Sequence, residues 1–193
     1  MALTAVADGH CAAIVTHLEM TERPRPQPLR AHPLRLVPWP QPDLAKYRAL
    51  FSRVGTPWLW FSRAVMPDVA VAAIIGDPAV EVFAVADPRG IEVGILELDF
   101  REAGNCEIGY FGLVTELNGQ GHGRWLMGEA LARAWRKDVT RVWVHTCTLD
   151  HPSALGFYHA QGFVPFKREV EIFPDPRLTG HLPADAAPQV PIL

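Results

Sequence analysis

The sequence predicts a single α+β domain, an α/β fold in which about four helices flank a mixed, mostly antiparallel sheet of about six to seven strands. Three observations lead to this prediction. A chain of 193 residues has the length of one ordinary domain. Apolar, β-branched runs gather in the second half, and segments with helical apolar spacing lie before and between them. The chain shows no internal repeat and no linker that would divide it.

Composition and charge limit the classes of function. Hydrophobic residues make up 49% of the chain and charged residues 20%, the balance of a soluble globular protein. The net charge of −3 supplies no overall positive field, which argues against nucleic acid and anionic membranes as partners. The three cysteines are widely spaced and form no disulfide framework. With no signal-peptide pattern and no apolar run of about 18–20 residues, the sequence predicts a cytoplasmic protein.

The first half of the chain is expected to hold one strand and two helices. Residues 12–20 have the β-branched, apolar content of a strand. Repeated prolines in 22–42 exclude a helix and a central strand, so we expect an extended connection there. Apolar residues at helical spacing predict a helix over 43–54, and a shorter helix is expected over 69–75. The aromatic stretch PWLWFSR, residues 57–63, lies between these two helices.

Strands dominate the centre of the chain. Three apolar runs predict consecutive strands over 79–87, 91–100 and 105–114, and the turn DPRG after the first suits a hairpin. A glycine-rich turn then leads into a predicted helix over 124–137. The apolar face of this helix consists of Met127, Ala130, Leu131 and Ala134. Three basic residues suit the C-terminal end of its dipole: Arg133, Arg136 and Lys137.

The last third of the chain is expected to hold two more strands around a short helix. The run over 141–149 shows little alternation, which predicts burial on both faces. Pro152 suits the first turn of the short helix, and Gly162 suits the position after its end. Residues 164–173 predict the final strand. The chain is thus divided into a domain over 12–173 and two segments expected to be mobile, an N-terminal one, 1–11, and a Pro-rich tail, 174–193.

The turn NGQGHGR, residues 118–124, is the strongest local indication of a ligand. The first N–H groups of a helix have no internal partner, and glycines let a pyrophosphate approach them closely. Gly119, Gly121 and Gly123 provide that access, and Arg124 can add a charged contact. The turn contains no P-loop pattern and lacks the spacing of a dinucleotide fingerprint. A tight strand-to-helix turn without a ligand is the alternative.

A second motif follows about thirty residues later. The first motif is Asn118-x-x-Gly121-x-Gly123, and the second, over 151–163, is H-x-x-A-x-x-F-Y-x-x-x-G-F. Together with the order of strands and helices over 12–173, this pair of motifs resembles the GNAT superfamily of acetyl-CoA-dependent N-acetyltransferases. Two positions depart from the family's usual residues. Asn118 replaces the common Gln or Arg, and His151 replaces the common Asn, which puts the affinity for CoA in question more than the fold.

The resemblance implies roles for individual residues. Phe111, Gly112 and Leu113 would lie beside the pantetheine arm of acetyl-CoA, with the Leu113 N–H aimed at the thioester carbonyl. Tyr158 would be the general acid that protonates the departing thiolate, and Glu107 would be the general base, with a water chain as its alternative. The residues that would contact acetyl-CoA are Phe111, Gly112, Leu113, Asn118, Gly119, Gln120, Gly121, His122, Gly123, Arg124 and His151.

Two other clusters of residues could have a function. His145, Cys147 and His151 lie close in sequence, but no fourth ligand at zinc-like spacing follows, so we expect no metal. Trp58, Leu59, Trp60 and Phe61 lie where the resemblance implies an acceptor site, although packing is the more common role of such residues. Trp143 and His145 are candidates for the same cleft.

The sequence as a whole therefore predicts transfer of an acetyl group from acetyl-CoA to a primary amine of a small molecule or peptide. The amine would attack directly in a ternary complex. The alternative is a catalytically weak module that binds CoA or a partner protein. The identity of the acceptor, the length of the acyl chain and the oligomeric state, including a homodimer, stay open.

Overall fold

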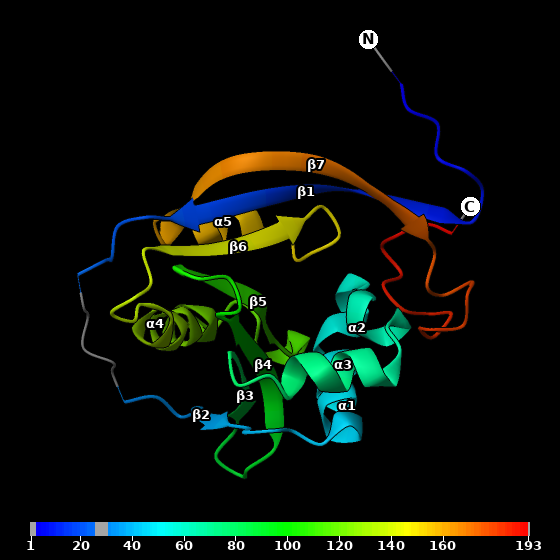
Figure 1. Ribbon diagram of the computed structural model, residues 1–193. Helices are drawn as coiled ribbons and strands as arrows, with labels where there is room; N and C mark the ends of the chain where they lie inside the picture. The colour runs from blue at the N-terminus through cyan, green and yellow to red at the C-terminus, as the bar shows by residue number, and fades with distance from the viewer. Residues whose placement is uncertain (1–2, 26–30, 193) are drawn as a thin grey trace.

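The computed structural model describes residues 3–25 and 31–192. Within these residues the chain forms one seven-stranded sheet with the order β2-β3-β4-β5-β6-β1-β7 (Figure 1). The strands are β1 (His10–Met20), β2 (Arg35–Pro38), β3 (Val80–Ala86), β4 (Glu92–Asp99), β5 (Asn105–Leu113), β6 (Arg141–Cys147) and β7 (Val164–Pro174). The helices are α1 (Leu44–Gly55), α2 (Ser62–Val65), α3 (Asp68–Ile75), α4 (His122–Ala134) and α5 (Ala154–Ala160). The predicted single α+β domain with a mixed, mostly antiparallel sheet is confirmed.

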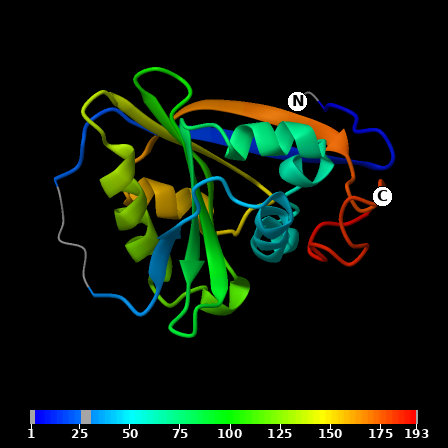
Figure 2. The same ribbon diagram turned by 60° about the horizontal axis from the view of Figure 1, so that its bottom comes forward.

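Helices cover both faces of this sheet. Figures 1 and 2 show α4 and α5 on one face and α1 and α3 on the other. The helical spacing predicted for α1 is confirmed, because Tyr47, Leu50, Phe51 and Val54 are all buried. A single main core joins these side chains to the central strands and to α4. None of the helices in the described part of the chain is long and apolar enough to cross a membrane.

One pair of neighbouring strands separates in the middle of the sheet. β5 and β6 are parallel, whereas the other neighbours are antiparallel, and their pairing runs only from Asn105 with Arg141 to Glu107 with Trp143. Directly after this point β5 carries a bulge, since Glu97 pairs with Tyr110 and the next β4 residue pairs with Ile108. A bulge bends its strand and increases the local twist. The carboxyl ends of β5 and β6 therefore diverge.

Four sequence predictions need correction. The proline-rich connection contains a short edge strand, β2, where proline is tolerated because one side of the strand needs no partner; residues 26–30 of the connection lie outside the described residues. The aromatic stretch continues into the unpredicted helix α2. β6 alternates between buried and partly exposed side chains instead of being buried on both faces. Pro152 lies before Ser153, the N-cap of α5, whereas Gly162 follows the helix end with a φ of +96°, as predicted.

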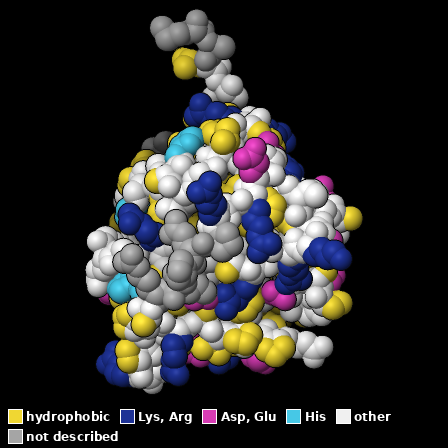
Figure 3. All heavy atoms as spheres, turned by 90° about the vertical axis from the view of Figure 1, so that its left-hand side faces the viewer, with side chains coloured by type: hydrophobic (Ala, Val, Ile, Leu, Met, Phe, Trp, Pro, Cys, Tyr) yellow, Lys and Arg dark blue, Asp and Glu magenta, His cyan; other side chains and the backbone are white. Residues whose placement is uncertain are grey.

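Helix α4 also ends earlier than the sequence predicts. Its last residue is Ala134, because the backbone of Trp135 leaves the helical conformation and its indole is buried in the core. Arg136 therefore lies outside the helix, where it pairs with Glu81 at 2.6 Å and stacks over the ring of Phe100. Figure 3 shows the face beside α4, on which basic side chains alternate with acidic and uncharged ones. Arg133 and Arg136 contact neighbouring carboxylates, and Arg136 also contacts an aromatic ring.

The C-terminal tail packs against the end of the sheet where β1 begins and β7 ends. Leu182, Ala186 and Ala187 form a second apolar cluster with Cys11 and Phe173. Beside this cluster, Asp175 and Arg177 form an ion pair at 2.6 Å, and only 2% of each side chain is exposed. The Arg177 guanidinium also donates to the carbonyl of Val190 at 2.7 Å. The tail has irregular backbone over the described residues, and the hydrogen bonds of Arg177 connect its two ends.

We expect Asp175→Asn to destabilise the protein by about 2 kcal/mol at neutral pH, because the buried guanidinium loses its charged partner. The hydrogen bond from Arg177 lowers the pKa of Asp175 from 3.8 to about 2. The carboxylate therefore stabilises the fold above pH 4, and this contribution is lost as the pH falls toward 2. Urea unfolding should show the difference between wild type and Asp175→Asn shrinking over that interval. Asp185→Asn, an exposed change in the same tail, should unfold like wild type at each pH.

Candidate active site

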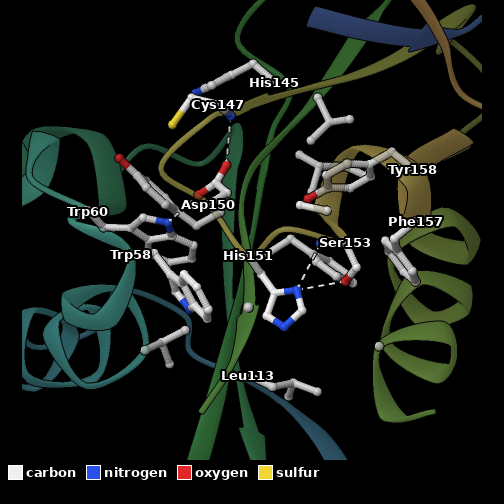
Figure 4. Close-up of a pocket in the computed structure, with 18 of the residues that line it drawn as sticks. Trp58, Trp60, Leu113, His145, Cys147, Asp150, His151, Ser153, Phe157 and Tyr158 are labelled. Carbon is white, nitrogen blue, oxygen red and sulfur yellow. Dashed lines mark hydrogen bonds between the residues drawn. The ribbon is translucent and has the colours of Figure 1, made fainter. Parts of the chain in front are cut away.

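The diverging ends of β5 and β6 border a cavity of about 500 Å³. Its volume lies within the range of small-molecule sites. Figure 4 shows Trp58 and Trp60 on one side of the cavity and Phe157 and Tyr158 on the opposite side. The predicted site residues that line it are Phe111, Gly112, Leu113, Asn118, Gly119, Gly121, Gly123, Arg124, His151 and Tyr158. Trp58 and Tyr158, which are 100 positions apart in sequence, thus face a common space.

The glycine turn leaves open space beside its backbone. Gly119 and Gly121 have φ angles of +74° and +83°, a conformation that glycine adopts without strain, and Gly121 caps the N-terminus of α4. A Cβ atom built on either residue would meet nothing within 4 Å. Gly123 follows on the first turn of α4 and faces the ring of Phe157. The N-terminus of α4 is therefore accessible to an anionic group from the cavity.

Two residues of the turn do not line the cavity. The Gln120 amide donates to the Glu116 carbonyl at 2.7 Å. The His122 ring lies 3.1 Å from His32, which stacks on Trp125. The sequence assigned both Gln120 and His122 to the ligand, because the motif does not show which side chains turn back onto the protein. Their backbone still forms part of the turn.

The edge of β5 presents free N–H groups to the cavity. The Val114 N–H donates to the Val93 carbonyl at 2.9 Å. Hydrogen-bonded and non-hydrogen-bonded pairs alternate along an antiparallel ladder, so Leu113, which pairs with Gly94, occupies a non-hydrogen-bonded position. Its N–H consequently points away from β4, toward the gap beside β6. Gly112 has a packing role as well, since a Cβ there would come within 2.7 Å of Val54.

Tyr158 reaches the cavity from α5 and is 7% exposed. Figure 4 shows its hydroxyl directed into the cavity, on the side of Asp150. The ring packs edge-on against Phe111 and Phe163. Burial, and then the negative charge of Asp150, raise the pKa of the phenol above its ordinary value of 10. Tyr158 is thus protonated at neutral pH and can donate a proton to a developing anion.

His151 is held by its own loop. Its Nδ1 accepts from the Ser153 N–H at 3.1 Å and lies 2.7 Å from the Ser153 hydroxyl. The ring stands edge-on to Trp58, with 5.1 Å between centroids. Because Nδ1 accepts a backbone N–H, the proton of a neutral ring is on Nε2. His151 can therefore offer one N–H donor to a ligand.

Asp150 is a site residue that the sequence analysis missed. It accepts three hydrogen bonds: from the Thr146 hydroxyl at 2.7 Å, from the Cys147 N–H at 2.9 Å and from the Trp60 indole at 3.1 Å. These bonds connect the end of β6 to the aromatic stretch after α1. The place of Asp150 directly after a predicted strand and before the second motif was the one signal in the sequence. The sequence does not show its partner, because Trp60 is 90 positions away.

Glu107 lies outside the cavity lining. Its carboxylate is 3.3 Å from Nδ1 of His145, and it is His145 that lines the cavity. Hydrogen bonding to Glu107 raises the pKa of His145 above 6.5, against the opposite effect of burial. Glu107 can therefore act on a molecule in the cavity only indirectly, through its contact with the imidazole of His145. Among the described residues, no group of His, Cys, Asp and Glu is arranged to hold a metal ion.

A buried polar network supports the wall of the cavity beside Trp60. Glu97 is 1% exposed and accepts from the Arg63 guanidinium at 2.6 Å and from the Tyr47 hydroxyl at 2.7 Å. Arg63 also lies beneath the ring of Tyr110, whose hydroxyl is 2.5 Å from Ser62. Tyr110 and Ser62 both line the cavity. The network therefore fixes α1, α2 and β5 relative to one another.

The splayed sheet, with the glycine turn at α4 and the buried phenol on α5, is the fold of an acyltransferase. The sequence matches the acetyltransferase (GNAT) family over residues 33–163. The chain belongs to this family, whose reaction is acetyl transfer from acetyl-CoA, and the predicted membership is confirmed. No curated protein sequence matches the chain.

Solved structures share the fold at low sequence identity. A GCN5-related N-acetyltransferase from Sphaerobacter thermophilus is similar with a TM-score of 0.62 and 19% identity, covering 86% of this chain and 53% of its own. A tandem GNAT protein from the clavulanic acid biosynthesis pathway has a TM-score of 0.57 and 16% identity, with 82% and 52% covered. An aminoglycoside acetyltransferase from an uncultured soil metagenomic sample has values of 0.54 and 18%, with 67% and 88% covered. The chain spans about half the length of the first two structures.

Proposed function

We propose that this protein transfers an acetyl group from acetyl-CoA to a primary amine of a small molecule or peptide. The observation that carries the proposal is one cavity bordered by the glycine turn, the free edge of β5, the Tyr158 phenol and an aromatic wall. We assign the transferase domain to residues 12–173, because β1 and β7 extend the sheet beyond the family match. The amine attacks the thioester directly while both substrates are bound.

Different residues of the cavity have different roles in this reaction. The N-terminus of α4, together with Asn118 and Arg124, binds the pyrophosphate. The Leu113 N–H donates to the thioester oxygen as it gains negative charge, a contribution of about 3–4 kcal/mol where such donors have been removed. Tyr158 protonates the departing thiolate. The sequence leaves two acceptors open for the proton of the amine, Glu107 and water.

A binding module is the second candidate, and His151 favours it. The common Asn of the second motif is replaced, and Nδ1 of the replacing imidazole is already bonded to Ser153. Such a module would bind CoA or a partner protein without turnover. Release of free thiol from acetyl-CoA in the presence of primary amines separates the two candidates, because only the transferase gives amine-dependent release.

Titration calorimetry with acetyl-CoA tests the glycine turn. We expect saturable binding by wild type and at least about tenfold weaker binding by Gly121→Ala, because the new methyl group takes the space of the phosphate. Gly90→Ala is the matched control, since Gly90 has a φ of +84° and equally open surroundings, but lies in the β3–β4 turn. Both changes should strain the backbone by about 1–3 kcal/mol. Equal loss of binding in both variants, or no binding by folded wild type, would contradict the proposed site.

A further inference from the structure

Two carboxylate–imidazole pairs lie on the same face of the sheet, and only one of them reaches the cavity. His145 on β6 lies 3.3 Å from Glu107 on β5, and His17 on β1 lies 3.0 Å from Glu169 on β7. The two imidazole centroids are 5.8 Å apart. His145 lines the cavity, whereas His17, Glu169 and Glu107 do not. The pairs are alike in chemistry and differ in access to a bound substrate.

The position of His145 follows from the divergence of the strands. The last pair of the parallel ladder joins Glu107 and Trp143. His145 is two residues farther along β6 and therefore on the same face as Trp143, beside the point where the strands part. Its side chain is 45% exposed and that of Glu107 is 25% exposed. Glu107 thus lies behind the imidazole, and His145 lies where the two strands admit a substrate.

We propose that His145 is the general base for the acceptor amine and that Glu107 is its positioning residue; this inference rests on the proposed function. An ionised carboxylate only accepts hydrogen bonds, so the pair places the imidazole proton on Nδ1 and leaves the Nε2 lone pair for the cavity. The general acid Tyr158 reaches the same cavity from α5. Base and acid thus belong to different elements around one space.

The charges around His145 favour this role. Glu107 faces it from β5, Asp150 from the loop after β6 and Glu171 from β7, and all three raise its pKa. His17 faces it from β1 and is itself paired with Glu169. Asp150 is occupied by three donors, so it is a poor acceptor for a substrate proton. Glu171 is the other carboxylate that lines the cavity, and it is the competing candidate for the base.

The step balances without a further reactant. The amine nitrogen forms a bond to the thioester carbon, and its proton passes to Nε2 of His145. The C–S bond then breaks, and the departing thiolate takes the proton of Tyr158. His145 releases its proton to water, and Tyr158 regains one from water. The net products are the acetylated amine and free CoA.

The test compares His145→Gln, Glu107→Gln and Glu171→Gln with the control pair His17→Gln and Glu169→Gln. Thiol release is followed from pH 6 to 10 with tryptamine, benzylamine, spermidine and a short peptide with a free amino terminus. We expect His145→Gln to lower kcat about 100-fold near pH 7. The loss should shrink toward pH 10, where hydroxide can take the proton of the attacking amine in place of the imidazole. Both control variants should stay within about twofold of wild type, a margin far below the effect of removing a base.

The positioning role of Glu107 has a separate signature. Without its carboxylate the imidazole pKa falls, so the acidic limb of kcat/KM, along which activity rises as the base loses its proton, should move to lower pH in Glu107→Gln, with an unchanged KM for acetyl-CoA. Loss of that limb in Glu171→Gln, with retention in His145→Gln, would overturn the proposal. Equal losses in the His145 and His17 variants would overturn it as well.

Nitrogen NMR of the resting protein gives a readout that needs no turnover. Long-range proton–nitrogen spectra, assigned with His145→Gln, should show His145 with its proton on Nδ1 and with a pKa that falls in Glu107→Gln. A proton on Nε2 would overturn the assignment of the base even if the protein acetylates amines. Conversely, folded wild type with the expected tautomer but no amine-dependent thiol release would overturn the proposed function, and the role of His145 as base with it.

Discussion

Replacing Tyr158 with phenylalanine should lower kcat by about 100-fold or more while leaving the affinity for acetyl-CoA nearly unchanged. A general acid contributes about 10²–10⁴ to a rate when it protonates a leaving group in the transition state. The phenylalanine ring keeps the packing against Phe111 and Phe163, so the shape of the cavity is preserved. Only the proton for the thiolate is removed. The effect should therefore appear in turnover and not in binding.

Thiol-release kinetics and acetyl-CoA calorimetry on the same preparations measure the two quantities. Because burial and Asp150 raise the pKa of Tyr158 above 10, its ionisation should cause no loss of wild-type activity below pH 9. Tyr110→Phe is a matched control, since that hydroxyl also borders the cavity but is engaged with Ser62. It should retain most of the turnover. Wild-type kcat in Tyr158→Phe would exclude the phenol as the acid.

Replacing Glu97 with alanine should cost about 3–5 kcal/mol of stability, the largest effect expected of any single change here. The substitution leaves the buried Arg63 guanidinium without its counter-charge and removes the acceptor of the Tyr47 hydroxyl. Moving an unpaired charge out of water is costly, and the well-packed surroundings of Glu97, itself 1% exposed, admit little solvent. The wall of the cavity should loosen together with the fold.

Urea unfolding followed by tryptophan fluorescence gives the stability difference. Glu92→Ala is the matched control on the same strand, because Glu92 pairs with Lys46 at the surface. Exposed pairs contribute about 0–1 kcal/mol, so this variant should unfold almost like wild type. If Glu97→Ala lost as little stability as Glu92→Ala, Arg63 would have to find other partners in the variant. The buried pair of Arg63 and Glu97 would then contribute no more to stability than a surface pair.

Local patterns in the sequence located most elements of the fold. The apolar spacing of α1, the hairpin turn DPRG between β3 and β4 and the place of Gly162 after the end of α5 depend on neighbours along the chain, and these three predictions hold in the structure. The same is true of the turn before α4. Edge strand β2 and helix α2 escaped prediction, because both are short and are stabilised by contacts with distant segments. Local propensity carries little information about such elements.

The site also has a part that local sequence patterns predict and a part that depends on distant contacts. The two motifs led from the sequence to Gly119, Gly121, Gly123 and Tyr158, which line one cavity in the structure. The motifs did not indicate that Gln120 and His122 turn back onto the protein, because side-chain direction depends on the partners available. Asp150 was missed for the same reason. Its role consists of bonds to Trp60, Thr146 and Cys147 that exist only after folding.

The family, the glycine turn and the phenol could be predicted from the sequence, because each is carried by residue types at fixed spacing along the chain. Which groups meet in space depends on the folded arrangement of the strands. The parting of β5 from β6 is set by a bulge and by packing on both faces of the sheet, and it places His145 in front of Glu107. Spacing along one strand predicts which face a side chain is on, but contact across two strands depends on their register and on where their pairing stops.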